Sequence, residues 1–338
     1  MARLAAFTRR SVLLLLTIAF VLSAGNFADA QYTLTSLVTT TADPNLVNAW
    51  GMAYATGGPF WISDNGTGKS TVYDATGSIV PLVVTIPAAS GAKGSPTGIV
   101  ANSTSGFVVT QNGVSGASDF IFATMDGTIS GWSPSVNGSS AVIAVNNHAT
   151  ANYTGLTIAT VGANTFLYAA NSATNQIEMY DSTFHLMKTF GDSTLTGLVV
   201  YGVQAIKGRI YVTFKGSGGA VDIFSTAGKL IKLLTKNGTA GPVLAPWGVA
   251  LAPSTFGPFS GDLLVGNVNN GKINAINLTS GKVVGMLKDT TGKVIAIPGL
   301  WALLFGGGST ATNGNTNQLF FAAGTNNYGT GEFGVINP

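Results

Sequence analysis

The sequence predicts an all-β protein in which six four-stranded sheets stand in a ring, and three observations lead to that prediction. A short motif, an aromatic residue or threonine followed by glycine, recurs about six times along the chain. Each copy is followed by short apolar segments with the alternation typical of β-strands. Glycine accounts for 45 of the 338 residues without a Gly-X-Y period, which suits a chain with many tight turns.

Composition excludes several other classes of protein. With 46% hydrophobic and only 9% charged residues, the chain is too apolar to be disordered. The lack of cysteine excludes a disulfide scaffold, a cysteine-ligated zinc site and a thiol nucleophile. The length would allow two average domains, but all-β rings of this size are common and no linker-like tract divides the chain. We therefore expect residues 31–338 to form a single domain, and the protein to be a monomer.

The first thirty residues have the three parts of a secretory signal peptide. A positively charged start precedes an apolar run over residues 11–22, and the small-residue motif Ala28-Asp29-Ala30 follows it. The apolar run is too short to cross a bilayer as a helix. The sequence therefore predicts a signal peptide over residues 1–30, with cleavage before Gln31. The positive charges are Arg3, Arg9 and Arg10.

The sequence also bears on the route and the destination of export. Arg9-Arg10 is compatible with the twin-arginine route, but the leucines from Leu13 to Leu16 favour the general secretory route. No later stretch is long and apolar enough to span a membrane, so we expect a mature protein in the periplasm or outside the cell. Removal of residues 1–30 lowers the net charge from +3 to +1, and the remaining basic residues are scattered, which argues against a nucleic-acid partner.

The recurring glycine defines six copies of one unit. Successive copies start 46 to 57 residues apart, the length of four short strands with their loops, which predicts a six-bladed β-propeller. The sixth copy ends after three strands, and an alternating segment, residues 32–38, precedes the first copy. We expect this N-terminal strand to join the last blade and close the ring. The anchor positions are Gly51, Gly98, Gly155, Gly202, Gly248 and Ala302.

Four strands are expected in each of the first five copies, in order from the central channel outward. Alternation in segments such as residues 176–180 and 220–224 supports this assignment. In the second copy, Gln111-Asn112-Gly113 is expected to join the second and third strands, and residues 137–152 to form a long insertion. The four segments of that copy are residues 96–100, 106–113, 119–122 and 126–130, and the second segment includes this turn.

Strings distributed over most of the copies match patterns of known families. They are Asn48-Ala-Trp-Gly-Met52, Phe60-Trp-Ile-Ser-Asp-Asn-Gly-Thr-Gly68, Phe122-Ala-Thr-Met-Asp-Gly-Thr-Ile-Ser-Gly-Trp132, Ala245-Pro-Trp-Gly-Val-Ala-Leu251, Gly271-Lys-Ile-Asn-Ala-Ile276 and Gly299-Leu-Trp-Ala-Leu303. The copies resemble the NHL repeat and the six-bladed propellers of the gluconolactonase and regucalcin superfamily. The whole chain after residue 30 also resembles a narrower group, exported bacterial propeller proteins of uncharacterised function. This resemblance implies the fold and export but no activity.

A propeller brings two sets of residues to one face of the ring, because inner strands start there and the loops between second and third strands lie beside them. An aromatic funnel with an amide-rich rim suits a sugar, whose C–H faces stack on rings and whose hydroxyls bond to Asn and Asp. The alternative is that the tryptophans pack between blades and the asparagines fill turns. The first set is Trp50, Thr97, Tyr153 or Thr154, Tyr201, Trp247 and Trp301; the second is Asp64, Asn65, Asn112, Asn171, Lys215, Asn267 and Asn326.

A metal-dependent enzyme is a different alternative. The hydrolases that the chain resembles hold a divalent cation in the channel with a Glu, Asn residues and an Asp. Here the chain after residue 30 contains only two glutamates, Glu178 within an expected strand and Glu332 at a strand end. Neither glutamate is therefore expected in the channel. Asp64 and the neighbouring Asn residues could coordinate Ca²⁺ through oxygen atoms, although we expect no bound cofactor.

The sequence thus favours an exported, non-catalytic propeller that binds a glycan, a small ligand or an envelope protein at the channel face. A catalytic triad is not indicated, because no nucleophile-elbow motif is present and His148 and His185 are expected at the surface. A lactonase or lyase of the gluconolactonase-like type, with a cation in the channel, remains the alternative. Clustering of Asp64 with amide oxygens would favour the enzyme, and an open aromatic funnel would favour binding.

Overall fold

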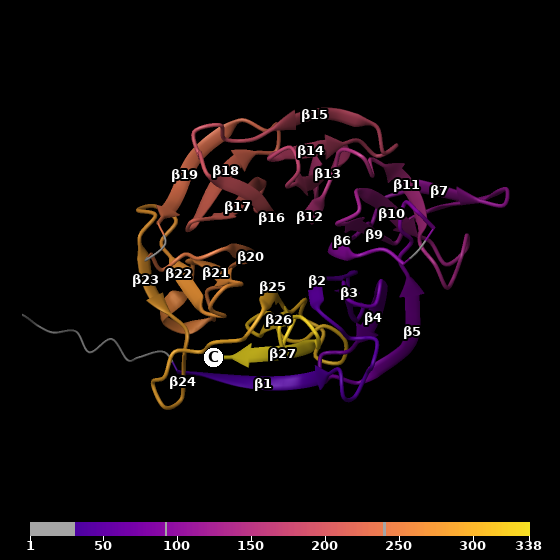
Figure 1. Ribbon diagram of the computed structural model, residues 1–338. Helices are drawn as coiled ribbons and strands as arrows, with labels where there is room; N and C mark the ends of the chain where they lie inside the picture. Colours follow the sequence, from indigo (N-terminus) through magenta and orange to yellow (C-terminus); the bar gives the residue numbers. More distant parts are fainter. Residues whose placement is uncertain (1–30, 92, 239–240) are drawn as a thin grey trace, which may run out of the picture.

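Six β-sheets follow one another around a central axis in the computed structural model, like the blades of a propeller (Figure 1). The structure describes residues 31–91, 93–238 and 241–338, so the expected signal peptide lies outside the described residues. Within these ranges the helical structure is one short 3₁₀ turn, η1 (Gly257–Phe259). No helix of the described chain is long and apolar enough to cross a membrane. The predicted all-β, six-bladed propeller is confirmed.

Each of the first five blades is an antiparallel four-stranded sheet. Blade 1 consists of β2 (Ala49–Tyr54), β3 (Phe60–Asp64), β4 (Lys69–Tyr73) and β5 (Ile79–Thr85). Blade 2 consists of β6 (Pro96–Ala101), β9 (Phe120–Thr124), β10 (Thr128–Trp132) and β11 (Val142–Asn146). Blade 3 consists of β12 (Tyr153–Val161), β13 (Asn164–Asn171), β14 (Gln176–Tyr180) and β15 (Leu186–Phe190). Blade 4 consists of β16 (Leu198–Ile206), β17 (Arg209–Gly216), β18 (Gly219–Ser225) and β19 (Leu230–Asn237). Blade 5 consists of β20 (Pro246–Leu251), β21 (Leu263–Asn267), β22 (Ile273–Ile276) and β23 (Val283–Met286).

The sixth blade joins the two ends of the described chain. Its first three strands are β25 (Leu300–Phe305), β26 (Leu319–Ala323) and β27 (Glu332–Asn337), and β1 (Gln31–Thr39) pairs antiparallel with β27 as the fourth. β24 (Lys288–Asp289) adds a short parallel pairing on the outer side of β1. The predicted closure of the ring by the N-terminal strand is confirmed.

Blade 2 differs from the prediction in its strand assignment. The segment expected as its second strand forms a separate hairpin, in which β7 (Val108–Gln111) pairs with β8 (Val114–Ala117). Asn112 and Gly113 both have positive φ, as the two-residue turn of a tight hairpin requires, and this Asn-Gly pair is the sequence signal that the prediction missed. The remaining strands of the blade are therefore β9 and β10, with β11 in the segment expected to be an insertion.

Glycine at one position of five inner strands lets neighbouring blades meet backbone to backbone. A Cβ atom on Gly98 would lie 2.1 Å from the amide nitrogen of Leu156, and one on Gly202 would lie 2.3 Å from the carbonyl oxygen of Trp247. No side chain fits at such distances. The recurring glycine of the sequence is therefore a requirement of close packing around the channel, not of a turn.

We expect Gly98→Ala to destabilise the protein much more than Gly155→Ala. At Gly98 the added Cβ would have to displace backbone, with a loss of about 3 kcal/mol in the free energy of unfolding, the upper range for overpacked sites. At Gly155 the nearest atom would lie 3.2 Å away, so a small shift relieves the contact. Urea unfolding followed by circular dichroism measures both losses, and equal losses would contradict this explanation of the glycine repeat.

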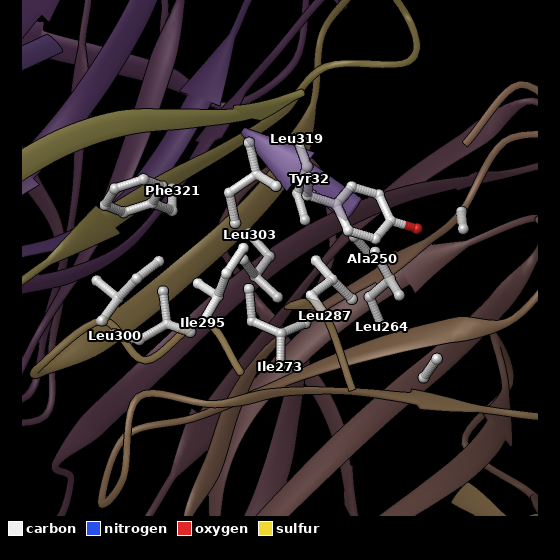
Figure 2. Close-up of a cluster of buried hydrophobic side chains, with 14 of the residues drawn as sticks. Tyr32, Ala250, Leu264, Ile273, Leu287, Ile295, Leu300, Leu303, Leu319 and Phe321 are labelled. Carbon is white, nitrogen blue, oxygen red and sulfur yellow. The ribbon is translucent and has the colours of Figure 1, made fainter. Parts of the chain in front are cut away.

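The hydrophobic core lies in the seams between neighbouring blades. The middle strands β3, β9, β21 and β26 are buried at every residue, since another blade covers each face, whereas most of β15 is exposed. Figure 2 shows the seam between blades 5 and 6, where Leu264 and Ile273 lie against Leu303 and Phe321, with Tyr32 of β1 beside them. Polar residues that alternate in a middle strand are consequently buried in a seam as well.

Candidate functional site

Four aromatic side chains meet at one end of the channel and form what we call the aromatic plug: Trp50, Tyr201, Trp247 and Trp301. They lie on the face where the inner strands begin, which we call the upper face; the inner strands end on the lower face. Trp50 stacks on Trp301 with ring centroids 3.6 Å apart and planes inclined by 14°. Tyr201 and Trp247 approach these two rings edge-on, at centroid distances between 5.7 and 6.5 Å. The predicted convergence of these four residues is thus observed.

The plug is packed and does not form an open funnel. Trp50 and Trp301 are only 4% and 3% exposed. Trp247 is partly exposed, and its Nε1–H donates to the carbonyl oxygen of Thr154 at 2.7 Å, which links blade 5 to blade 3 across the channel. The alternative considered from the sequence, that the tryptophans are packing residues, therefore accounts for their mutual contacts.

A chain of side-chain hydrogen bonds continues from the plug over the upper face. The Nε1–H of Trp301 donates to Oδ1 of Asn48 at 2.9 Å, and Nδ2 of Asn48 donates to Oδ1 of Asn65 at 3.1 Å. Nδ2 of Asn65 in turn donates to the carbonyl oxygen of Pro96 at 3.1 Å. The chain connects blades 6, 1 and 2, so Asn65 is occupied in holding blades together.

Below the plug the channel is almost filled. The cavity that remains between the inner strands has a volume of about 20 Å³, with Gly51, Gly98, Leu156 and Gln204 in its wall. This is room for one or two water molecules. The close approach of the inner strands at their glycines is the reason, and it leaves no space for a substrate at this level of the channel.

Lys215 lies at the edge of the plug. Its Nζ is 3.8 Å from the centroid of the Tyr201 ring, in a cation–π contact. Burial lowers the pKa of Lys215, and burial also raises the pKa of Tyr201 well above its ordinary value. A cation on this ring helps to hold Tyr201 against the tryptophans.

Two of the predicted residues lie inside the seam between blades 2 and 3. Nδ2 of Asn171 donates to Oε1 of Glu178 at 2.7 Å, and Oε2 of Glu178 accepts hydrogen bonds from the hydroxyls of Tyr153 and Tyr180 at 2.6 and 2.5 Å. All four side chains are buried. Tyr153 therefore does not face the channel; its neighbour Thr154 occupies the position on the ring.

Asp64 and Asn267 are also buried and are not on the surface of the channel face. Asp64 lies in the seam between blades 6 and 1, and neither of its oxygens has a hydrogen-bond partner of normal geometry in the described chain. Burial, with the charge of Asp43 nearby, raises the pKa of Asp64 well above its usual range. Oδ1 of Asn267 accepts a hydrogen bond from the backbone N–H of Leu244 at 2.9 Å, which fixes the loop before β20. These rim positions serve the packing of loops on blades.

The last two predicted residues are far apart. Asn112 lies in the turn between β7 and β8, a hairpin that projects from the outer side of blade 2 in Figure 1. Asn326 is exposed in the loop between β26 and β27 on the upper face, next to the plug. Of the twelve predicted residues, the structure thus brings together the four of the plug and places Asn65, Lys215 and Asn326 around them.

A pocket of about 410 Å³ lies beside the plug on the upper face, and we call it the upper pocket. The loops between β21 and β22 and between β26 and β27 form its walls. Tyr328 is 44% exposed in this wall, and its ring lies over Trp301 at a centroid distance of 5.7 Å. The lining residues are Val268, Asn269, Asn270, Gly271, Pro298, Gly299, Gly324, Asn327 and Tyr328.

The backbone that presents Tyr328 is strained. Asn326, Asn327 and Tyr328 have φ angles of 49°, 52° and 66°, so three consecutive residues are in the left-handed region. Asparagine tolerates this region, but for a tyrosine it is an outlier that costs about 1 kcal/mol or more. Strain of this kind often accompanies function.

The sequence interpretation missed the side chains of the upper pocket. The prediction assigned to the ligand site the first polar residue after each second strand. The pocket is lined instead by residues further along the loops, such as Asn269 and Asn327. Runs of asparagine at 269–270 and 326–327 were the available signal. Asn48, which links Trp301 to Asn65, was also missed.

Within the part of the chain that the structure describes, acidic side chains and histidines do not gather at the plug or the upper pocket. Within residues 31–91, 93–238 and 241–338, no three His, Cys, Asp or Glu side chains lie close enough together to hold a metal ion. Asp64 and Glu178 are in different seams, each away from the channel.

Comparison with known proteins gives sequence relatives whose names assign no activity. No protein-family model matches the chain. Uncharacterized protein R648 of Acanthamoeba polyphaga mimivirus is 27% identical over 304 residues, which cover 83% of this chain and 72% of the relative. Uncharacterized protein L690 of the same virus is 27% identical over 284 residues, 77% of this chain and 74% of the relative. The expected bacterial origin and membership of the NHL group stay predictions.

Solved structures with the same fold include two lyases. A streptogramin B lyase has a TM-score of 0.55 and 12% identity, with 90% of this chain and 97% of that chain covered. Virginiamycin B lyase from Staphylococcus aureus has a TM-score of 0.53 and 13% identity, with 91% and 100% covered. At such identity the likeness shows the propeller fold alone.

Proposed function

We propose that this protein is a non-catalytic carbohydrate-binding propeller whose site is the upper pocket. The observation that carries the proposal is the exposed ring of Tyr328, held over Trp301 beside a cavity of about 410 Å³ with asparagines in its wall. The C–H face of a sugar stacks on an aromatic ring, and amide groups both donate hydrogen bonds to hydroxyls and accept them. The expected signal peptide would place this binding outside the cytoplasm.

The chemistry of the wall favours a neutral sugar that is bound without reaction. None of the nine lining residues is charged, and none is a histidine, serine or threonine. A charged sugar would find no counter-ion there, and a bond-breaking step would find no carboxylate, imidazole or aliphatic hydroxyl, only the phenol of Tyr328. The side chains of Asn269, Asn327 and Tyr328 make no hydrogen bond within the described chain, so their polar groups are available to a ligand.

Tyr328→Ala is expected to weaken the binding of a neutral oligosaccharide at least about tenfold, because the stacking platform is lost. The measurement begins with a panel of neutral mono- and oligosaccharides, screened by isothermal titration calorimetry and by tryptophan fluorescence, since Trp301 lies under the site. Asn327→Ala should weaken the same ligand. Met187→Ala, which removes an exposed side chain from β15 on the outer rim, is the matched control and should change nothing.

Two results would contradict the proposal. One is that no member of the panel binds at millimolar concentration. The other is that a sugar binds but Tyr328→Ala and Met187→Ala bind it equally well, which would place the sugar elsewhere on the molecule.

A further inference from the structure

The lower mouth of the channel opens into a second binding-sized space, which the proposed carbohydrate site does not use. Two cavities of about 410 and 260 Å³ lie there, and both are lined by Tyr54, Gln204, Ala205 and Leu304. They are therefore neighbouring parts of one basin, which we call the lower basin. Each volume is in or near the range of small-molecule pockets, about 300 to 1,000 Å³.

The wall of the lower basin is mostly apolar. The ends of the inner strands supply it, and the short side chains of Ala205, Ala250 and Ala252 leave the space that Leu304 and Phe305 border. Gln204 also borders the small channel cavity above, so the basin lies directly below the closed channel. A ligand in the basin would be bound at the opposite end of the molecule from the upper pocket.

Two polar groups stand on one side of this apolar wall, and both come from the same stretch of chain. Gln204 is on β16, and Lys207 is in the turn that follows it. Within the described chain neither side chain makes a hydrogen bond, and Lys207 makes no ion pair. No Asp or Glu lines either cavity, so the charge at the rim of the basin is positive and unopposed.

We propose that the lower basin binds a medium-chain aliphatic carboxylate. The carboxylate accepts hydrogen bonds from the ammonium group of Lys207 and the side-chain amide of Gln204. The hydrocarbon chain of the ligand lies across the mouth of the channel, over the alanines and against Leu304 and Phe305, where its burial supplies most of the affinity. An aliphatic ligand without a charged head group would lose the interaction with Lys207, and a ligand with a cationic head group would be repelled by Lys207.

Decanoate is the probe, titrated by calorimetry into the protein lacking residues 1–30 and kept below the concentration at which it forms micelles. We expect one decanoate per chain, and an affinity about tenfold higher than that of octanoate because two more CH₂ groups are buried. Decyltrimethylammonium, which has the same chain length and the opposite charge, should not bind at the same concentrations.

Lys207→Gln should weaken decanoate binding about tenfold, and Gln204→Ala should weaken it by a smaller factor. Lys229→Gln is the matched control, because Lys229 is an exposed lysine in another turn of blade 4, between β18 and β19, and it lines neither cavity. The proposal is overturned if decanoate shows no saturable binding, if decyltrimethylammonium binds as well, or if Lys207→Gln and Lys229→Gln have equal effects. Each of these results leaves the carbohydrate proposal unaffected, because the two sites share no residue.

Discussion

Replacement of Trp301 by alanine is expected to lower the free energy of unfolding by about 4 kcal/mol, within the range found when a buried tryptophan is truncated. Trp301 is 3% exposed, stacks on Trp50 at 3.6 Å and contacts Tyr201 and Trp247 edge-on. Its loss would leave a cavity at the centre of the plug. It would also leave Oδ1 of Asn48 without its donor and so break the hydrogen-bond chain between blades 6 and 1. Urea unfolding followed by far-ultraviolet circular dichroism measures the loss.

Two variants separate packing from hydrogen bonding. Trp301→Phe keeps an aromatic ring in the stack but removes the Nε1–H donor, so we expect a loss of about 1 to 2 kcal/mol. Trp247→Ala removes a ring that is only partly buried, and it should cost less than Trp301→Ala. If Trp301→Ala unfolds at the same urea concentration as the wild type, the plug does not stabilise the six-bladed propeller. The aromatic side chains would then have to be reconsidered as a ligand surface.

The position of the plug residues was predictable from the sequence, but their arrangement was not. Glycines such as Gly98 and Gly202 recur because the inner strands touch there, and this regular contact makes the repeat visible in one dimension. The repeat also places the preceding residue of each copy at the channel. Whether side chains there point apart or fill the channel depends on its width, and that width is a property of the whole ring.

The rim residues show a different limit of the sequence. Asn171 and Asn267 are at the predicted places in the repeat, yet their amides are used by Glu178 and by the backbone of Leu244. In a sequence, an asparagine that satisfies a buried group looks the same as one that faces a ligand. Whether such an asparagine bonds to the protein or faces a ligand depends on the path of the loop that precedes each inner strand. The sequences of these loops do not repeat from blade to blade, so the path cannot be read from the repeat.

Asp222→Asn is expected to flatten the pH dependence of stability between pH 5 and pH 8. Asp222 is fully buried in the middle of β18, and neither of its oxygens has a hydrogen-bond partner of normal geometry in the described chain. Burial and the adjacent carboxylate of Asp192 raise its pKa from 3.8 to about 7. Asp192 is itself only 7% exposed and accepts hydrogen bonds from the backbone N–H and hydroxyl of Thr194.

The direction of the effect follows from proton binding. In the unfolded chain Asp222 loses its proton near pH 3.8, whereas in the folded protein it keeps the proton up to about pH 7. Between these values the folded state binds more protons, so the free energy of unfolding falls as pH rises, by at most about 1.4 kcal/mol per pH unit. From pH 5 to pH 8 the wild type should therefore lose about 3 kcal/mol on account of this residue.

Asparagine at position 222 cannot ionise, so the variant should be more stable than the wild type at pH 8 and show a flatter profile. Urea unfolding at pH 5, 6, 7 and 8 measures both effects. Some slope of the same sign should remain, because burial also raises the pKa of Asp64. Asp181→Asn makes the same chemical change at an exposed turn where hydrogen bonds lower the pKa, so that carboxylate stays ionised over this range and the variant should keep the wild-type slope. Equal slopes in Asp222→Asn and Asp181→Asn would mean that the seam between blades 3 and 4 admits a counter-ion or water that ionises Asp222 at low pH.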